Sequence, residues 1–213
     1  MIQVLMPSVS QLITADYKSI KSLETERLIN QTLKGLYPVK HPELRQVSGI
    51  PGAGKSSYCA THLPPNFALI SFDAIMVKLK GYQKVLKESG AARAYAEYEM
   101  PARIIGYELL QRAIHLKLNI MLEHSGVNEA HIELFQNLAK RGYKTTVDCV
   151  MCKTDVALQR TQKRAEEINR YVPESVVLER ASKIKEYMAK YQKIATSVAF
   201  LDGENNFAPL SKI

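Results

Sequence analysis

A glycine-rich segment at residues 49–56, with the sequence GIPGAGKS, constrains the fold of this chain more than any other feature. It matches the pattern G-x-x-x-x-G-K-[ST], in which glycines let successive backbone N–H groups converge on one polyphosphate. In this pattern Lys55 reaches the β- and γ-phosphates, and the hydroxyl of Ser56 can bind Mg²⁺. The segment therefore predicts a nucleotide-phosphate loop with ATP and Mg²⁺ as its ligands. The residues expected to contact the nucleotide are Gly49, Pro51, Gly52, Ala53, Gly54, Lys55, Ser56 and Ser57.

The segments on either side of this loop have the pattern that phosphate binding requires. Residues 44–48 (LRQVS) are expected to form a short strand, although they are more polar than a buried parallel strand usually is. Residues 55–62 are expected to form a helix that ends before Pro64 and Pro65. A glycine-rich loop between a strand and a helix is the context in which this motif binds phosphate.

Apolar segments alternate with helical patterns along the rest of the chain. We expect strands at residues 66–73, 119–123, 143–152 and 197–202. We expect helices at residues 91–118, 127–141, 154–169 and 173–194, whereas residues 74–90 are rich in lysine and show no clear period. This alternation predicts a mostly parallel sheet with helices on both faces. The expected fold is an α/β three-layer fold of the P-loop NTPase type in residues 44–213, preceded by a helical extension in residues 1–43.

The composition fits one α/β domain with an extension, since 46% of the 213 residues are hydrophobic and 23% are charged. The net charge of +8 suits an anionic ligand, a nucleic acid or an anionic membrane surface, although the lysines are scattered. No apolar stretch approaches the roughly 20 residues of a membrane span, and residues 1–7 lack the features of a secretion signal.

The chain has three cysteines, an odd number that favours a reducing cytoplasm over a disulfide framework. Cys149 and Cys152 have C-x-x-C spacing, but they lie in an apolar segment that is expected to be a strand. Residues three apart on a strand point to opposite faces, so we expect core packing rather than a zinc site.

Two carboxylates follow expected strands at the edge of the sheet that the phosphate loop also occupies. The carboxyl ends of parallel strands share one edge, so Asp73 and Glu123 are expected near residues 49–56. Asp73 can accept a proton from an acceptor hydroxyl or hold metal-bound water; the alternative is that it only caps a helix beginning at Ala74. Glu123 can bind substrate hydroxyls or Mg²⁺-coordinated water, and Ser125 adds a hydroxyl to the same turn.

Arg160, Arg164 and Arg170 lie close together late in the chain. In an ordinary helix such a group is a solvated face. In P-loop kinases, however, a mobile basic segment closes over the phosphates and neutralises charge in the transition state. This role fits Arg160 and Arg170 best, with Arg164 as a further nucleotide contact. Arg103, on the helix before the strand at residues 119–123, is a candidate contact for an anionic acceptor.

From about residue 44 to residue 202 the chain resembles the zeta-toxin family of P-loop small-molecule kinases. The resemblance rests on GIPGAGKS, on the strand ending in Asp73, on NIMLEHS at residues 119–125, on the run at residues 143–152, on TDVALQR at residues 154–160 and on RYVP at residues 170–173. Members of the family transfer the γ-phosphate of ATP to a hydroxyl, in the best-known cases of UDP-N-acetylglucosamine. The resemblance implies phosphate and metal contacts by Lys55 and Ser56, acceptor activation by Asp73, acceptor contacts by Glu123 and Ser125, and a phosphate clamp of Arg160 and Arg170. It also implies a neutralising partner of the antitoxin type.

Two departures from the family pattern both concern the acceptor side. In the family an aromatic residue and an arginine often follow the strand aspartate, as in D-x-F-R, whereas AIMV follows Asp73 here. The family's turn of the Glu-Gly-Thr type is Glu123-His124-Ser125 in this chain, and His124 is expected to be a turn residue rather than an acid or a base.

Two other functions remain open. A polynucleotide 5′-hydroxyl kinase would suit the charge of +8, but the sequence has no basic stripe interleaved with aromatic residues of the kind that stacks single-stranded bases. A non-catalytic nucleotide-binding module could use residues 1–40 to recruit another protein, but such a module needs only the phosphate loop. We therefore expect an ATP-dependent kinase that acts on a small hydroxylated acceptor in the cytoplasm, either of its own cell or of a cell into which it is delivered.

Overall fold

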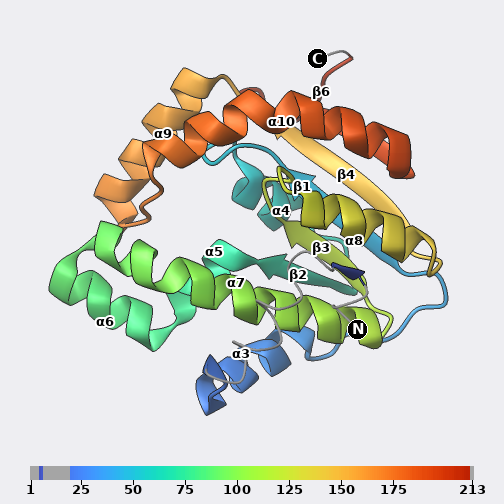
Figure 1. The fold of residues 1–213 in the computed structure, drawn as a ribbon, viewed down its shortest axis with the longest axis horizontal. Coiled ribbons are helices and arrows are strands. Elements are labelled where there is room, and N and C mark those ends of the chain that lie inside the picture. Colours follow the sequence, from blue (N-terminus) through green and yellow to red (C-terminus); the bar gives the residue numbers. More distant parts are fainter. Residues whose placement is uncertain (1–4, 7–19, 212–213) are drawn as a thin grey trace.

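In the computed structural model, which describes residues 5–6 and 20–211, six strands form one sheet (Figure 1). The strands are β1 (Glu43–Ser48), β2 (Phe67–Ser71), β3 (Asn119–Glu123), β4 (Lys144–Met151), β5 (Ser197–Asp202) and β6 (Ala208–Pro209). They lie in the order β2-β3-β1-β4-β5-β6, and every neighbouring pair except β5 with β6 is parallel. The expected mostly parallel sheet is confirmed.

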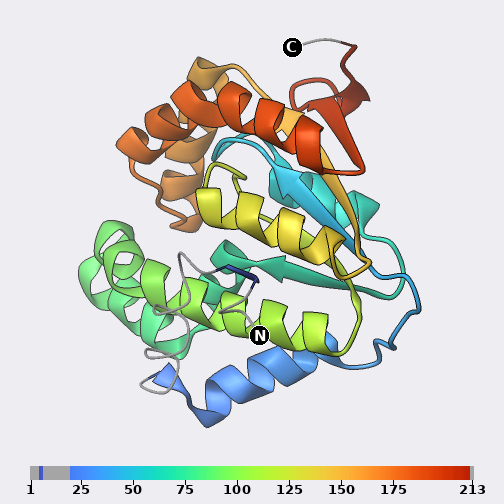
Figure 2. The same cartoon turned by 45° about the vertical axis from the view of Figure 1, so that its right-hand side comes forward.

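Helices cover both faces of this sheet and give it three layers. The helices are α3 (Leu23–Leu33), α4 (Lys55–His62), α5 (Phe72–Lys78), α6 (Lys80–Ser89), α7 (Ala91–His115), α8 (Glu129–Ala139), α9 (Thr154–Ile168) and α10 (Glu174–Ile194). Parallel connections are right-handed, so the strand order places α7, α8 and α10 on one face and α4 on the other. Figure 2 shows α7, α8 and α10, coloured green to orange, in front of the strands, with the cyan helix α4 behind them.

The interior strands are buried on both faces, which explains their composition. The centre of β3, residues 120–122, is apolar and fully buried. In β1, the buried amide of Gln46 donates from Nε2 to Ser48 Oγ at 3.0 Å, and its Oε1 lies 2.8 Å from His131 Nδ1. The polar residues of β1 therefore belong to a buried hydrogen-bond network, which is why a polar segment can form a central strand.

The register of the sheet brings the ends of three strands together. Val47 of β1 lies opposite Glu123 of β3, and Ser71 of β2 lies opposite the same Glu123. The glycine-rich loop directly follows β1, and α5 directly follows β2. The loop, the start of α5 and the end of β3 therefore meet at one edge of the sheet, as expected.

Asp73 does not end a strand, which corrects the sequence-based expectation. β2 ends at Ser71, whose Oγ accepts a hydrogen bond of 3.4 Å from the backbone N–H of Ala74 and thereby caps α5. Asp73 lies in the first turn of α5, where the positive end of the helix dipole favours a carboxylate. The alternative that Asp73 itself caps this helix is also wrong, because Ser71 does so.

Residues 74–90, which showed no clear period in the sequence, form most of α5 and all of α6. Tyr82 is the buried residue of α6, and the other positions of this helix are half-buried or exposed. A helix that buries so little gives a weak apolar repeat, which is why the sequence did not predict it.

Within the described part of the expected N-terminal extension, residues 23–33 form α3. This helix begins with a capping box between Ser22 and Thr25 and packs against α7 and β2. Arg112 of α7 donates to both carboxylate oxygens of Glu26, at 2.7 and 2.9 Å. Residues 1–4 and 7–19 of the expected extension lie outside the described residues, and the proposed boundary at residue 43 stays a prediction.

Two further observations concern the composition. None of the described helices combines the length and the apolar character needed to cross a lipid bilayer. Cys149 is fully buried in β4, in agreement with core packing, and Cys152 is half-buried just beyond the end of that strand.

Candidate active site

A cavity of about 490 Å³ opens at the carboxyl edge of the sheet. The glycine-rich loop, α5, α7, the turn after β3, the segment from α9 to α10 and the loop after β5 all contribute to its wall. Among the described residues, seven cationic and four acidic side chains line it. They are Lys55, Arg103, Arg160, Lys163, Arg164, Arg170 and Arg180, with Asp73, Glu99, Glu123 and Glu167. An excess of positive charge in a cleft favours a polyanionic ligand.

The glycine-rich loop packs tightly against the first turn of α9. Gly52 has a φ of +87°, a conformation that favours glycine, and a Cβ at this position would lie 2.3 Å from the carbonyl oxygen of Ala157. No larger residue fits between the loop and the helix without moving one of them. The contact therefore fixes the loop against the helix that carries Arg160 and Arg164.

Lys55 is the first residue of α4, and its ammonium group lies within the loop. Its Nζ donates to the carbonyl oxygens of Gly49 and Ile50, each at 3.0 Å. Burial lowers the pKa of Lys55, while the carboxylates of Glu123 and Asp73 act in the opposite direction. A buried ammonium whose direct partners are neutral carbonyls favours an anion beside it.

Glu123 contacts the loop directly, because β3 is the neighbour of β1 in the sheet. The hydroxyl of Ser56 donates to Glu123 Oε1 at 2.6 Å. A hydroxyl and a carboxylate side by side are hard oxygen ligands of the kind that Mg²⁺ prefers, so this pair fits a Mg²⁺ ion bound to a nucleotide. Of the two roles expected for Glu123, this contact favours the one on the metal side over the one on the acceptor side.

Asp73 contacts the segment that joins α9 to α10. Arg170 Nη2 lies 3.2 Å from Asp73 Oδ2, and the Asp73 side chain remains 49% exposed. Tyr82 of α6 donates from Oη to the carbonyl oxygen of Asn169 at 3.3 Å. The connecting segment is therefore held over Asp73 from both α5 and α6.

Arg160 lies apart from the other two arginines of this region. Its Nη1 donates to the carbonyl oxygen of Gly203 at 3.0 Å and to that of Gly52 at 3.4 Å. It thus joins the glycine-rich loop to the loop after β5. This position is at the rim of the phosphate loop, rather than over the centre of the cavity where the sequence-based clamp would place it.

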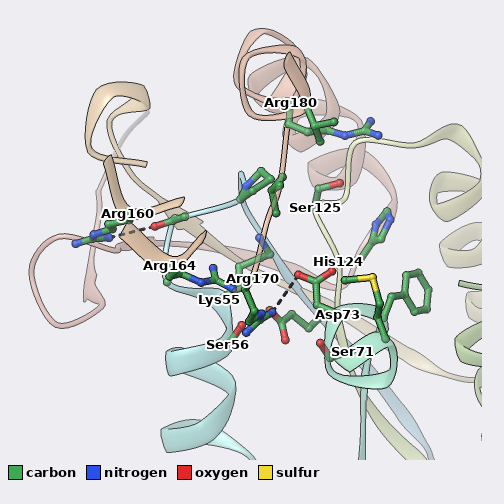
Figure 3. Close-up of a pocket in the computed structure, with 18 of the residues that line it drawn as sticks. Lys55, Ser56, Ser71, Asp73, His124, Ser125, Arg160, Arg164, Arg170 and Arg180 are labelled. Carbon is green, nitrogen blue, oxygen red and sulfur yellow. Dashed lines mark hydrogen bonds and ion pairs between the residues drawn. The ribbon is translucent and has the colours of Figure 1, made fainter. Parts of the chain in front are cut away.

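Arg164 takes the more central position. Figure 3 shows Arg164 and Arg170 near Lys55 and Asp73, with Arg160 to one side. Burial lowers the pKa of Arg164, and the positive charge of Arg170 acts in the same direction. Two guanidinium groups and an ammonium that repel one another are stabilised when a polyphosphate lies between them.

Arg103 and Ser125, two of the four residues expected on the acceptor side, line the same cavity. Arg103 of α7 pairs with Glu99, with Nη2 2.5 Å from Oε1. Ser125 follows β3, and its Oγ accepts a hydrogen bond of 3.4 Å from the backbone N–H of Val127. The cavity therefore contains every residue that the sequence assigned to acceptor binding or acceptor activation.

Sequence reasoning missed Arg180 and underestimated His124. Arg180 lines the cavity from α10 and donates from Nη1 to the carbonyl oxygen of Val127 at 2.7 Å. In the sequence it is one of many charged residues on a long helix, and no motif marks it. His124 was expected only in a turn, but it also lines the cavity. Burial, and after it the neighbouring His131, hold the pKa of His124 well below its ordinary value.

Aromatic side chains gather where the phosphate loop meets the end of the chain. Phe207 lines the cavity and makes an edge contact with Tyr58, with ring centroids 5.2 Å apart. Tyr58 in turn stacks on His62 at 4.2 Å. Phe207 and the nearby Arg160 offer flat surfaces of the kind on which a nucleobase can stack.

A comparison with protein families gives a match over most of the chain. The model of the family described as "Zeta toxin" matches residues 27–205. No curated protein matches the sequence.

Several solved structures share the fold at low sequence identity. A chain of the PezAT chromosomal toxin-antitoxin system of Streptococcus pneumoniae has a TM-score of 0.66 and 18% identity, with 92% of this chain and 79% of that chain covered. The AvrRxo1-ORF1:-ORF2 structure with ATP has a TM-score of 0.61 and 12% identity, with 87% and 64% covered. A chain of the Pnkp1/Rnl/Hen1 RNA repair complex has a TM-score of 0.51 and 14% identity, with 83% and 50% covered. The present chain thus spans less than two thirds of the last two proteins, and at these identities the likeness concerns the fold alone.

Proposed function

Because this chain belongs to the zeta toxin family and is a P-loop phosphotransferase, we propose that it transfers the γ-phosphate of ATP to a hydroxyl of a small acceptor. UDP-N-acetylglucosamine, the acceptor implied by the family resemblance, is the first one to test. The observation that supports this function is the presence of three devices in one cavity: Lys55 in the phosphate loop, the Ser56–Glu123 pair and the Asp73–Arg170 pair. A protein that only binds a nucleotide needs the first of these but not the last.

In the proposed mechanism, fixed positive groups hold the triphosphate. The backbone N–H groups of the loop and the ammonium of Lys55 surround the β- and γ-phosphates. Arg164 and Arg170 then neutralise the charge that spreads over the γ-phosphoryl oxygens in the transition state. Lys55 is held within the loop by the carbonyl oxygens of Gly49 and Ile50, so its ammonium group needs little reorganisation to meet the phosphates.

Ser56 and Glu123 are the residues that would hold Mg²⁺ with the nucleotide. The Ser56 hydroxyl is a direct ligand in this motif, and the Glu123 carboxylate, 2.6 Å away, orients it. When bound, Mg²⁺ neutralises charge on the β- and γ-phosphates.

Asp73 is the proposed general base. As the acceptor oxygen bonds to the γ-phosphorus, the acceptor proton passes to the Asp73 carboxylate. The bond between the γ-phosphorus and the β,γ-bridging oxygen breaks, and its electron pair leaves with ADP. Arg170 pairs with Asp73. A triphosphate offers Arg170 a more highly charged partner and thereby makes the carboxylate available to the acceptor.

The acceptor would bind on the Asp73 side of the cavity, where the remaining cations lie. Arg103, which pairs with Glu99, lines the cavity together with Arg180 and Ser125. Arginines in such a position favour an acceptor that already carries a negative charge. A sugar nucleotide is one acceptor of this kind.

A direct assay tests the proposal. The purified protein is incubated with ATP and Mg²⁺, and with no acceptor, with UDP-N-acetylglucosamine, with a neutral sugar or with a 5′-hydroxyl oligonucleotide. We expect ADP and an acceptor heavier by one phosphate in the second reaction. Transfer to the oligonucleotide alone would instead identify a polynucleotide kinase. ADP without any phosphorylated acceptor, or no ADP at all, would contradict the proposed function.

We also propose a neutralising partner protein. The support is that the PezAT structure comes from a toxin-antitoxin system and that AvrRxo1-ORF1 is found in complex with AvrRxo1-ORF2. If the chain acts as a toxin, its expression in bacteria arrests growth, and the Lys55→Ala variant does not. Normal growth of bacteria that express an active enzyme would argue against a neutralising partner, because there would be no toxicity to neutralise.

Glu123→Gln is expected to raise the Mg²⁺ concentration needed for half-maximal activity by about tenfold or more, the effect typical of an outer-shell metal partner. The amide keeps the size of the side chain but loses the charge that faces Ser56. The measurement is a Mg²⁺ titration at fixed ATP, with the exposed Glu88→Gln as the control. A change confined to the KM of the acceptor would instead assign Glu123 to acceptor binding.

Arg164→Lys and Arg170→Lys are each expected to lower kcat by at least about tenfold, because lysine keeps the charge but loses the two-pronged contact with phosphate. Arg160→Lys is expected to affect the KM of ATP more than kcat, since Arg160 contacts loop carbonyls. Hydrogen exchange across residues 154–175 is expected to slow when a non-hydrolysable ATP analogue and Mg²⁺ are added. Unchanged exchange together with normal kinetics of all three variants would show that these arginines form a solvated face; the exposed Arg141→Lys is the control.

A further inference from the structure

The turn after β3 places an imidazole between Glu123 and Ser125. The backbone N–H of His124 donates to the carbonyl oxygen of Val47 at 3.1 Å, which fixes the turn to β1. The ring nitrogen Nδ1 accepts a hydrogen bond of 3.1 Å from the backbone N–H of Gly126. Because an N–H group donates to Nδ1, that nitrogen carries a lone pair, and the ring proton lies on Nε2.

A second histidine holds this ring from behind. The rings of His124 and His131 stack with centroids 3.8 Å apart and an interplanar angle of 14°. His131 is itself fixed, since Nδ1 lies 2.8 Å from Gln46 Oε1 and Nε2 lies 3.1 Å from Tyr107 Oη. Both nitrogens of His131 are therefore engaged inside the core, and the orientation of the His124 ring is set by packing.

The turn cannot relax easily around this ring. Gly126 has a φ of +79°, and a Cβ there would lie 2.5 Å from Ser48 Oγ. Tyr191 donates from its buried Oη to the carbonyl oxygen of Gly126 at 3.1 Å. The position of Nε2 is thus fixed by the backbone as well as by the ring stack.

Nε2 of His124 faces the cavity. The other ring nitrogen binds Gly126, and no described residue is a hydrogen-bond partner of Nε2. Among the described residues no buried side-chain nitrogen or oxygen lacks a partner, so solvent must reach Nε2. The cavity is the solvent-filled space that His124 lines. One N–H donor is therefore presented to whatever molecule fills this part of the cavity.

The surroundings of the ring indicate which part of the ligand it meets. His124 makes an edge contact with Phe72, with centroids 5.7 Å apart, and Phe72 precedes Asp73 at the start of α5. Arg103 and Arg180, and after them Lys55, are close enough to act on His124 electrostatically. The donor thus lies near the start of α5, the helix that carries the proposed base, and near the cations that would bind an anionic group.

We propose that His124 is a specificity-determining residue of the acceptor site. Its Nε2–H donates to a neutral hydroxyl or carbonyl oxygen of the acceptor, and Arg103 and Arg180 match the negative charge that the acceptor carries elsewhere. This inference rests on the proposed function and assigns to the acceptor a second oxygen near the hydroxyl that is phosphorylated. A site with a fixed polar group rejects analogues that leave the group unpaired, so acceptors without this oxygen are poor substrates.

Two substitutions of His124 test the roles of its two ring nitrogens separately. His124→Asn keeps an acceptor for the Gly126 N–H but has no atom at the position of Nε2. His124→Gln places an N–H donor near the position of Nε2. We expect His124→Asn to raise the KM of the acceptor about fivefold, the effect of losing one neutral hydrogen bond, and His124→Gln to stay within about twofold of the wild type. The KM of ATP should change in neither variant, and because both lose the ring stack on His131, any fall in melting temperature should be similar in the two. His115→Asn and His115→Gln, at an exposed position of α7, are the matched controls.

The probe is an equimolar mixture of nucleotide sugars and sugar phosphates that includes UDP-N-acetylglucosamine, with products identified by mass spectrometry. Kinetics are then measured with the compound that the wild type phosphorylates best. A normal acceptor KM in His124→Asn would overturn the role of His124 and leave the kinase function intact. An equal increase of the acceptor KM in His124→Asn and His124→Gln would also overturn the role of His124, because it would indicate a structural role. If the wild type phosphorylates no compound in the mixture, the proposed acceptor class is wrong, and the inference about His124 is wrong with it.

Discussion

Lys55→Ala is expected to lower kcat for phosphoryl transfer by roughly a hundredfold to a thousandfold, the loss typical when one preorganised group is removed from a developing negative charge. The ammonium of Lys55 lies inside the glycine-rich loop and is held there by the carbonyl oxygens of Gly49 and Ile50. Alanine cannot reach a phosphate from this position. The measurement is the rate of ADP formation at saturating ATP and acceptor.

The same variant is expected to keep its fold. Burial lowers the pKa of Lys55 in the folded protein, so a protonated Lys55 opposes folding at neutral pH. Its removal should therefore not lower the melting temperature, which thermal unfolding would show. The exposed Lys84→Ala of α6 controls for the loss of a positive charge. Near-normal turnover by Lys55→Ala would refute the assignment of the phosphate loop.

Asp73→Asn is expected to lower kcat by about a hundredfold or more, in the range typical for the loss of a general base. Asparagine keeps the shape of the side chain and can still accept a hydrogen bond from Arg170, but it cannot take the acceptor proton. The dissociation constant of ATP should change little, because the direct contact of Asp73 is with Arg170 and not with the glycine-rich loop. Single-turnover kinetics and equilibrium binding of ATP separate the two effects.

A structural effect of Asp73→Asn would be small and is measurable separately. Ser71 caps α5, so Asp73 contributes to this helix only through the dipole, an effect of about 0.3–1 kcal/mol. Asp155→Asn is the matched control, since Asp155 is an exposed carboxylate in the first turn of α9. If Asp73→Asn turns over as fast as Asp155→Asn, Asp73 is not the base.

The outline of the site could be predicted from the sequence because its parts lie at strand ends. The glycine-rich loop follows β1, Glu123 ends β3 and Asp73 comes two residues after β2. Parallel strands bring these positions to one edge whatever the details of packing. The expected strand was extended to Asp73 by mistake. In the sequence, Ser71 looks like one more strand residue, and nothing there shows that its side chain caps α5.

The partners of these residues could not be predicted in the same way. Ser56 and Glu123 are 67 positions apart, and their hydrogen bond depends on β3 lying next to β1. The contacts of Arg160 with loop carbonyls depend on where α9 lies relative to two loops. Arg180 comes from a helix whose charged residues look alike in the sequence. Tertiary packing decides each of these contacts, and no local pattern encodes it.

The contact between Gly52 and Ala157 links the proposed nucleotide site to the proposed acceptor site through α9. The start of α9 is pressed against the glycine-rich loop, and its end leads into Arg170, which pairs with Asp73. One end of α9 therefore lies at the proposed nucleotide site, and the other end leads to the proposed acceptor site. Because Gly52 and Ala157 are in steric contact, a displacement of the loop backbone by bound phosphates would also displace the start of α9. A side chain at position 52 would push the start of α9 away from the loop even without a nucleotide.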